Sequence, residues 1–433
     1  MTAIPQQLNY AAGALNTLPE GTNSQSMVVV PSNGSTFDTD GAIITFDLPS
    51  RGYLQPSTMY LRYKCTVTAD GTAAPRMKGT PAYTPFVNST VLLGSQVVES
   101  IQNYNALNNV IFNTKMDVAG KQAYAYALGY SGSNVLALNG RLLSSTTSET
   151  WDMAMPLNNV IANCDHLVPL KHMPLVRIQL TMDAIANMFT TTSQQTISLN
   201  NLELCYDVVE FGGSTEAVVA SLADENGNIM IKSQSYSTSS QTLPTNVGGT
   251  QELVFNNRLS SIKSLFTILG GNGVEQVNGS YFDSVDITNS LGSYQFYVAG
   301  VPYPARPLSA LRNKAGIFQE LTDCWSGNTS DMYGARMAIT KAEFSYNAEL
   351  STTGDAGTTT YSTPGKFYIG INTERLPESS TLLTGVSSQL TPIHLRLEFG
   401  SHTTDSAHLI TLITLHDVIV NCNILTKQAS VKN

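Results

Sequence analysis

A cysteine and a histidine two residues apart, Cys164 and His166, are the first candidates for chemistry in this sequence. Such a pair could supply two of the four ligands of a zinc site, which takes nitrogen and sulfur donors in tetrahedral geometry. A zinc site also needs a second pair from a nearby segment, and no such pair lies close in the sequence. We therefore interpret Cys164 and His166 as loop residues and predict no metal site.

Other motifs also fall short of the chemistry that they suggest. Residues 224–228 begin like a calcium loop but lack its distal glutamate, so an Asn-Gly hairpin turn is the better interpretation. The pairs Gly120-Lys121 and Gly365-Lys366 lack the upstream glycine of a phosphate-binding loop. Segment 129–133 lacks the final glycine of a nucleophile elbow. Acids far apart in sequence could still meet in space, but no spacing favours a carboxylate pair for glycoside hydrolysis. We predict that the protein is not an enzyme and has no catalytic or cofactor-binding residues.

The composition limits the partners of the chain. Charged residues make up only 13% of the 433 residues, against roughly 25% in typical soluble proteins. Hydrophobic residues reach 42%, so the chain can fold, and a folded surface poor in charge is typical of extensive contact with other protein. The net charge is −9 and no cluster of lysine and arginine is visible, which argues against specific nucleic-acid binding.

The cysteines and the apolar segments bear on the compartment. The five cysteines are scattered and odd in number, which favours free thiols in a reducing compartment. The N-terminus shows no basic region followed by an apolar stretch, so we expect no signal peptide and synthesis inside the cell. No run of about 18 apolar residues is present, so we expect no transmembrane segment.

A pair of predicted strands, which would position any functional site, occurs twice in the sequence. Residues 177–209 have the pattern of two strands joined by a polar turn, and a matching pair occupies 394–420. Asp207 and Asp417 hold equivalent places almost half the chain apart. In both copies, as in residues 59–67, apolar and polar residues alternate, which predicts strands with one face buried and one face in water. A repeat on this scale predicts two similar domains in tandem.

A second set of matches lies upstream in each half. Gly94 precedes a stretch from 97 to 111 whose apolar residues recur at three- and four-residue steps, which predicts a helix. In the second half, Gly300 precedes a stiff segment at 304–307 and a second predicted helix over 308–321. The two glycines are separated by nearly the same distance as the repeated strands, which supports the duplication.

We place the domain boundary between the two repeats. The first domain then spans 1–212, including an N-terminal arm, and the second spans 213–433. The Gly- and Thr-rich segments 238–250 and 351–363 are expected to be exposed loops. Each half has the profile of about eight strands with long polar loops and one or two short helices. This profile predicts an all-β protein made of two tandem eight-stranded jelly-roll sandwiches.

Four groups of residues carry a resemblance to a known family. They are Pro31–Phe37 with Leu54–Leu61, Val97–Leu107, Arg258–Phe266 with Tyr294–Pro304, and Phe367–Glu374 with Leu383–Val386. In these stretches the sequence resembles the double jelly-roll major capsid protein of small eukaryotic DNA viruses, the group of polinton-like viruses, adintoviruses and virophages. The resemblance follows the order of the chain over most of its length.

The resemblance implies a structural role in a virus shell. Three copies would form a homotrimeric, pseudo-hexagonal capsomer, and many capsomers would tile an icosahedral virion shell around double-stranded DNA. The implied partners are other copies of this chain, a penton protein and minor capsid proteins, and the implied location is the virion. The family implies no catalytic residues.

Three other functions compete with this interpretation, and one of them, a secreted adhesion domain, would need a signal peptide or paired cysteines, which the sequence does not show. A capsid protein of a bacterial virus with the same double-barrel plan would share these features. A two-domain β-sandwich carbohydrate-binding protein or glycosidase would instead show clustered exposed aromatic residues, usually tryptophan, over which sugars stack. The only two tryptophans, Trp151 and Trp325, are far apart in sequence. We expect both to lie in a core or an interface.

Overall fold

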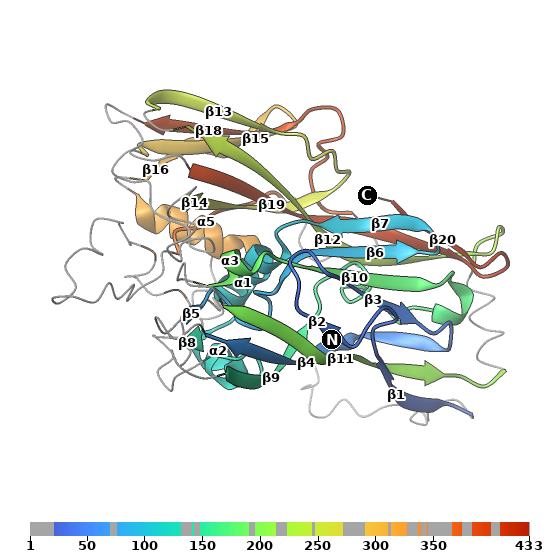
Figure 1. Ribbon diagram of the computed structural model, residues 1–433. Helices are drawn as coiled ribbons and strands as arrows, with labels where there is room; N and C mark the ends of the chain where they lie inside the picture. The colour runs from blue at the N-terminus through green and yellow to red at the C-terminus, as the bar shows by residue number, and fades with distance from the viewer. Residues whose placement is uncertain are drawn as a thin grey trace, which may run out of the picture.

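The computed structural model describes most of the chain, in segments. These are residues 21–69, 76–130, 141–142, 148–189, 195–213, 223–244, 247–271, 291–310, 313–326, 337, 339, 344, 366–374, 383–399 and 408–432. The N-terminal arm before residue 21, residues 131–133, Gly365 and the expected loop at 351–363 lie outside these segments. The described residues are mainly antiparallel strands (Figure 1).

The first unit, here called the first roll, consists of two antiparallel sheets. One sheet has the order β1 (Asn23–Val29), β11 (Thr196–Glu210), β4 (Tyr53–Thr68) and β9 (Ser148–Pro156), and β2 (Thr36–Phe37) also pairs with β11. The other has the order β3 (Ile43–Leu48), β10 (Val176–Met182), β6 (Phe86–Leu93) and β7 (Gln96–Ile101). Alternating apolar residues of both sheets fill the space between them, as in other sandwiches.

The second unit, the second roll, repeats this arrangement. One sheet has the order β12 (Asn228–Leu243), β19 (His408–Asn423), β14 (Ile262–Gly271) and β17 (Ile369–Asn372), with β20 (Gln428–Lys432) paired to β19. The other has the order β13 (Gly249–Phe255), β18 (Ile393–Phe399), β15 (Ser293–Val298) and β16 (Val301–Ser309). Each roll thus has eight principal strands in the same order along the chain. The predicted all-β fold of two eight-stranded jelly rolls is confirmed.

Short elements connect these strands. They are β5 (Arg76–Met77), α1 (Tyr104–Lys115), α2 (Val118–Tyr124), β8 (Arg141–Leu142), η3 (Leu170–His172), α3 (Ile185–Met188) and α5 (Lys314–Ser326). The helices α1 and α5 follow β7 and β16, which are equivalent strands in the two rolls. Among the helices described, none is long and apolar enough to cross a membrane.

The repeated strands match in register as well as in order. Asp207 on β11 lies opposite Ser26 on β1, and Asp417 on β19 lies opposite Gln234 on β12. Each long strand also has an irregular register with its other neighbour close to this aspartate. The duplication inferred from the sequence is therefore confirmed, whereas the boundary at residue 212 stays a prediction.

Two predicted helices begin later than expected. Residues 96–101 form strand β7, because Gly94 adopts a left-handed φ of 63° that turns the chain back against β6. Residues 301–309 form strand β16, which ends before α5 begins at Lys314. The prolines of this segment are tolerated because β16 is an edge strand, where a missing N–H removes no essential ladder bond.

Two expectations about exposure are also wrong. In β19 every residue from 410 to 418 is buried, so both faces of this strand are covered instead of one. One face of its sheet lies against the other sheet of the second roll, and helix α5 packs on β14 and β17 of the same sheet (Figure 1). The expected loop at 238–250 is mostly strand, because β12 continues to Leu243 and β13 begins at Gly249.

Candidate functional site

The two residues that suggested a zinc site, Cys164 and His166, lie in different environments, one buried and one exposed. Cys164 is buried and its Sγ donates to the Val160 carbonyl at 3.2 Å, whereas His166 is exposed. Burial raises the pKa of the Cys164 thiol to about 12, which opposes the thiolate form that a metal requires. Within the described segments, no group of three His, Cys, Asp or Glu side chains could hold a metal ion.

The two other described motifs have structural roles. Asp224 Oδ1 accepts hydrogen bonds from the backbone N–H groups of Asn226 and Asn228, at 2.9 and 2.7 Å, which makes the segment a polar turn. Lys121 is buried, and its Nζ donates to Asn113 Oδ1 at 2.9 Å and lies 5.6 Å from the centre of the Phe112 ring. A lysine held in this way is not presented to a phosphate.

Both tryptophans are in packed positions, as expected. Trp151 is 7% exposed on β9, and Trp325 in α5 stacks on Phe266 with ring centres 4.6 Å apart. Neither forms an exposed platform on which a sugar could stack.

A surface hollow of about 600 Å³ over β4 contains two carboxylates, those of Asp152 and Glu203. Each lies next to a cation: Arg62 Nε is 2.5 Å from Glu203 Oε2, and Lys64 Nζ is 3.8 Å from Asp152 Oδ1. Both are ion pairs on an accessible surface, with side-chain exposures of 33% for Glu203 and 74% for Asp152, and not a buried pair of acids. The hollow therefore gives no support to the glycosidase alternative.

Polar contacts of a different kind join the two rolls. The backbone N–H of Asp165 in the first roll donates to the Lys232 carbonyl on β12 at 3.1 Å, and Asn163 Nδ2 donates to the Gln234 carbonyl at 3.2 Å. In the other direction, Ser233 Oγ donates to the Val160 carbonyl at 2.5 Å. The segment 160–165 thus occupies the outer edge of β12, a main-chain edge that would otherwise be open to another strand.

A buried carboxylate lies within this joint. Glu99 on β7 is 6% exposed, and its two oxygens accept from Ser235 Oγ on β12 and from the Val160 backbone N–H at 2.9 Å. Burial raises the pKa of the Glu99 carboxyl to about 7, although both hydrogen bonds favour the ionised form. Glu99 therefore bridges the two rolls and can gain or lose a proton near neutral pH.

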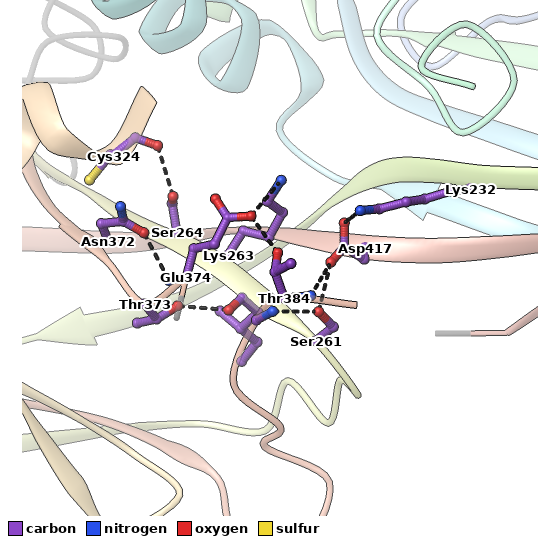
Figure 2. Close-up of polar contacts among 12 residues, drawn as sticks. Lys232, Ser261, Lys263, Ser264, Cys324, Asn372, Thr373, Glu374, Thr384 and Asp417 are labelled. Atoms are coloured by element: carbon purple, nitrogen blue, oxygen red, sulfur yellow. Dashed lines mark hydrogen bonds and ion pairs between the residues drawn. The ribbon is translucent and has the colours of Figure 1, made fainter. Parts of the chain in front are cut away.

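A second buried carboxylate holds the second roll together (Figure 2). Asp417 Oδ2 accepts from Ser261 Oγ at 2.8 Å and from the Thr384 backbone N–H at 3.3 Å, while Lys232 Nζ lies 3.8 Å from Oδ1. Next to it, Lys263 pairs with Glu374 at 3.1 Å, and Glu374 accepts from Thr384 Oγ1. The network links β12, β14 and β19 to the connection between β17 and β18.

Sequence reasoning identified Asp417 only as a repeat position and missed Glu99. Asp207, the counterpart of Asp417, is only half-buried and accepts from the exposed Ser26, so equivalence in sequence did not reveal which one is a core residue. Glu99 carried a weak signal, because it is the one acid in the apolar stretch 97–101 and no lysine or arginine is near it in sequence. The assignment of that stretch to a helix concealed its inward position on β7.

The whole arrangement matches solved viral proteins. The Faustovirus major capsid protein superposes with a TM-score of 0.61 at 10% identity, covering 96% of this chain and 93% of that chain. The PBCV-1 virus capsid gives 0.60 at 10% identity over 98% and 99%, and the mavirus major capsid protein gives 0.59 at 9% identity over 100% and 95%. No protein-family model and no curated protein matches the sequence. At this identity the likeness concerns the fold, and the chain has the double jelly-roll fold of viral major capsid proteins.

Proposed function

We propose that the protein is a major capsid protein whose homotrimer is a pseudo-hexagonal capsomer of an icosahedral virion shell. The observation that carries the proposal is the double jelly roll itself, which matches capsid proteins along almost the entire length of both chains. Three chains with two like rolls each present six similar units, so one gene product can fill positions of a hexagonal lattice. The boundary between the rolls is placed at residue 212.

The surface chemistry is consistent with such an assembly. Stable shells need large interfaces, and a chain with only 13% charged residues buries few ions when it forms them. The net charge of −9 disfavours close contact with DNA. We therefore expect counterions or basic partner proteins to neutralise the phosphates of the enclosed double-stranded genome. Penton and minor capsid proteins would complete the shell, the protein would reside in the virion, and it would carry out no catalysis.

Light scattering on a size-exclusion column tests the trimer. The purified chain of 46.6 kDa is expected to elute with a mass of about 140 kDa, three times that of one copy. A chain that stays monomeric at high concentration and across a range of salt would contradict the capsomer. If that monomer also bound immobilised glycans, the proposed capsid function would be replaced by the carbohydrate-binding alternative.

A further inference from the structure

The contact between segment 160–165 and β12, which forms the joint between the two rolls, has a counterpart position in the first roll that no described part of the chain occupies. In the second roll, the outer edge of β12 is covered by segment 160–165 of the first roll, through the carbonyls of Lys232 and Gln234. The strand that corresponds to β12 in the first roll is β1, because each is the first strand of its roll and the edge strand beside the last principal strand, β19 or β11. A roll that makes the same contact with the first roll would therefore bind along the outer edge of β1.

The positions correspond residue by residue. Lys232 and Gln234 lie opposite Ile419 and Asp417, and Ser24 and Ser26 lie opposite Val209 and Asp207. The carbonyls of Ser24 and Ser26 are thus the counterparts of the two acceptors that the first roll uses on β12. In the described part of the chain, β11 is the only strand that pairs with β1, so its other edge is uncovered.

The composition of β1 also differs from that of strands whose edges are protected. Exposed edges in soluble proteins carry charges or proline, which prevent pairing with another chain. The edge strand β16 has prolines at 302, 304 and 307, and the edge strand β9 has Glu149 and Asp152. The seven residues of β1 include neither a charge nor a proline. Val28, which is 48% exposed, and Val30, which is 62% exposed, add apolar surface there.

We propose that the outer edge of β1 is the contact between chains, and that the second roll of a neighbouring copy docks on it as the first roll docks on β12 within one chain. The inference rests on the proposed trimer and assigns its interface. Each chain supplies one covered edge, at β12, and one uncovered edge, at β1. Three chains arranged head to tail would cover all six edges and close a ring, because the same kind of contact recurs at every step.

Substitutions at β1 separate this contact from the fold. Val28→Lys places a positive charge on the exposed apolar surface at β1 and keeps every main-chain bond between β1 and β11. In Ser24→Pro a proline ring stands at the edge beside the Ser24 carbonyl, where proline hinders pairing with another chain. Each variant is expected to weaken trimer association about 100-fold, as measured by light scattering over a dilution series, because an interface that buries an unpaired charge or meets a proline on its edge strand is destabilised. Circular dichroism is expected to match the parent chain.

The control is Ser148→Lys, which places the same charge at the exposed start of β9, the opposite edge of the same sheet. This variant is expected to associate like the parent chain. Amide exchange supplies a readout without substitution: residues 23–29 of the parent chain are expected to exchange slowly in the trimer and rapidly after dilution to monomer. Parent-like association of Val28→Lys, or unchanged exchange on dilution, would overturn the contact while leaving the trimer standing. A parent chain that never trimerises would overturn both.

Discussion

Replacement of Asp417 by alanine is expected to lower the free energy of unfolding by about 3–5 kcal/mol, which is the range for removing one partner of a buried ion pair. The side chain of Asp417 is 0% exposed and that of Lys232 is 13% exposed, so the substitution removes a carboxylate that lies 3.8 Å from the lysine Nζ in a site with little water. Ser261 and the Thr384 backbone N–H would also lose their acceptor. The change can be measured from urea unfolding of the purified chain, followed by circular dichroism.

The duplicated fold offers a matched control in Asp207→Ala. Asp207 occupies the equivalent strand position but is only half-buried, and its partner Ser26 is exposed. Water can replace that partner, so the expected loss is about 1 kcal/mol or less. Equal losses from the two substitutions would show that burial of Asp417 contributes nothing to stability, and would contradict the role assigned to the network in Figure 2.

The stability of the joint between the rolls is expected to fall as the pH rises through the range from 4.5 to 7. The pKa of Glu99 is raised from 4.5 to about 7 in the folded chain, so the folded state holds a proton that the unfolded state has already released. The stabilisation is therefore complete below pH 4.5, decreases up to about pH 7 and is lost above it. A shift of this size corresponds to about 3 kcal/mol.

Glu99→Gln isolates this effect from all other titrations. Glutamine keeps an oxygen acceptor but has no proton to lose, so the unfolding free energy of the variant is expected to exceed that of the parent chain at pH 8 and to lose the advantage near pH 4.5. The ionisable groups around Glu99 are Tyr104 on α1, Tyr236 on β12 and Cys164, and burial raises the pKa of each, so all stay neutral in this range. Parallel pH profiles for the two proteins would refute the assignment.

The parts of the fold that the sequence predicted are those in which one roll alone decides burial. In β4 the alternation over residues 59–67 predicted one buried face, and each apolar residue on that face is at most 3% exposed. The period of two is strong there because the opposite face meets water. The repeated strands β10 and β18 were predictable for the same reason, and the order of the repeated strands along the chain was sufficient to indicate two jelly rolls.

The parts that the sequence did not predict depend on contacts with elements that are distant in the sequence. Residues 97–101 contain apolar side chains at spacings that suit a helix or a strand, and only the turn at Gly94 and the neighbouring β6 decide for the strand. β19 has two buried faces because its sheet packs against the other sheet of the second roll and also against α5, and no local pattern encodes the second cover. Glu99 is likewise buried by a distant element, since its partner Ser235 is supplied by the other roll.

Because the two rolls belong to one chain, their association with each other does not depend on the concentration of the protein. The docking of the first roll on β12 is an intramolecular event, with an effective concentration that for short flexible connections is in the millimolar range. In the proposed trimer, dilution would leave this half of the contacts untouched and would act only on the half made between chains. A ring of six separate single rolls would assemble with a sixth-power dependence on concentration, whereas a ring of three such chains depends on the third power. In the proposed trimer, fusion would thus lower the chain concentration at which the ring assembles.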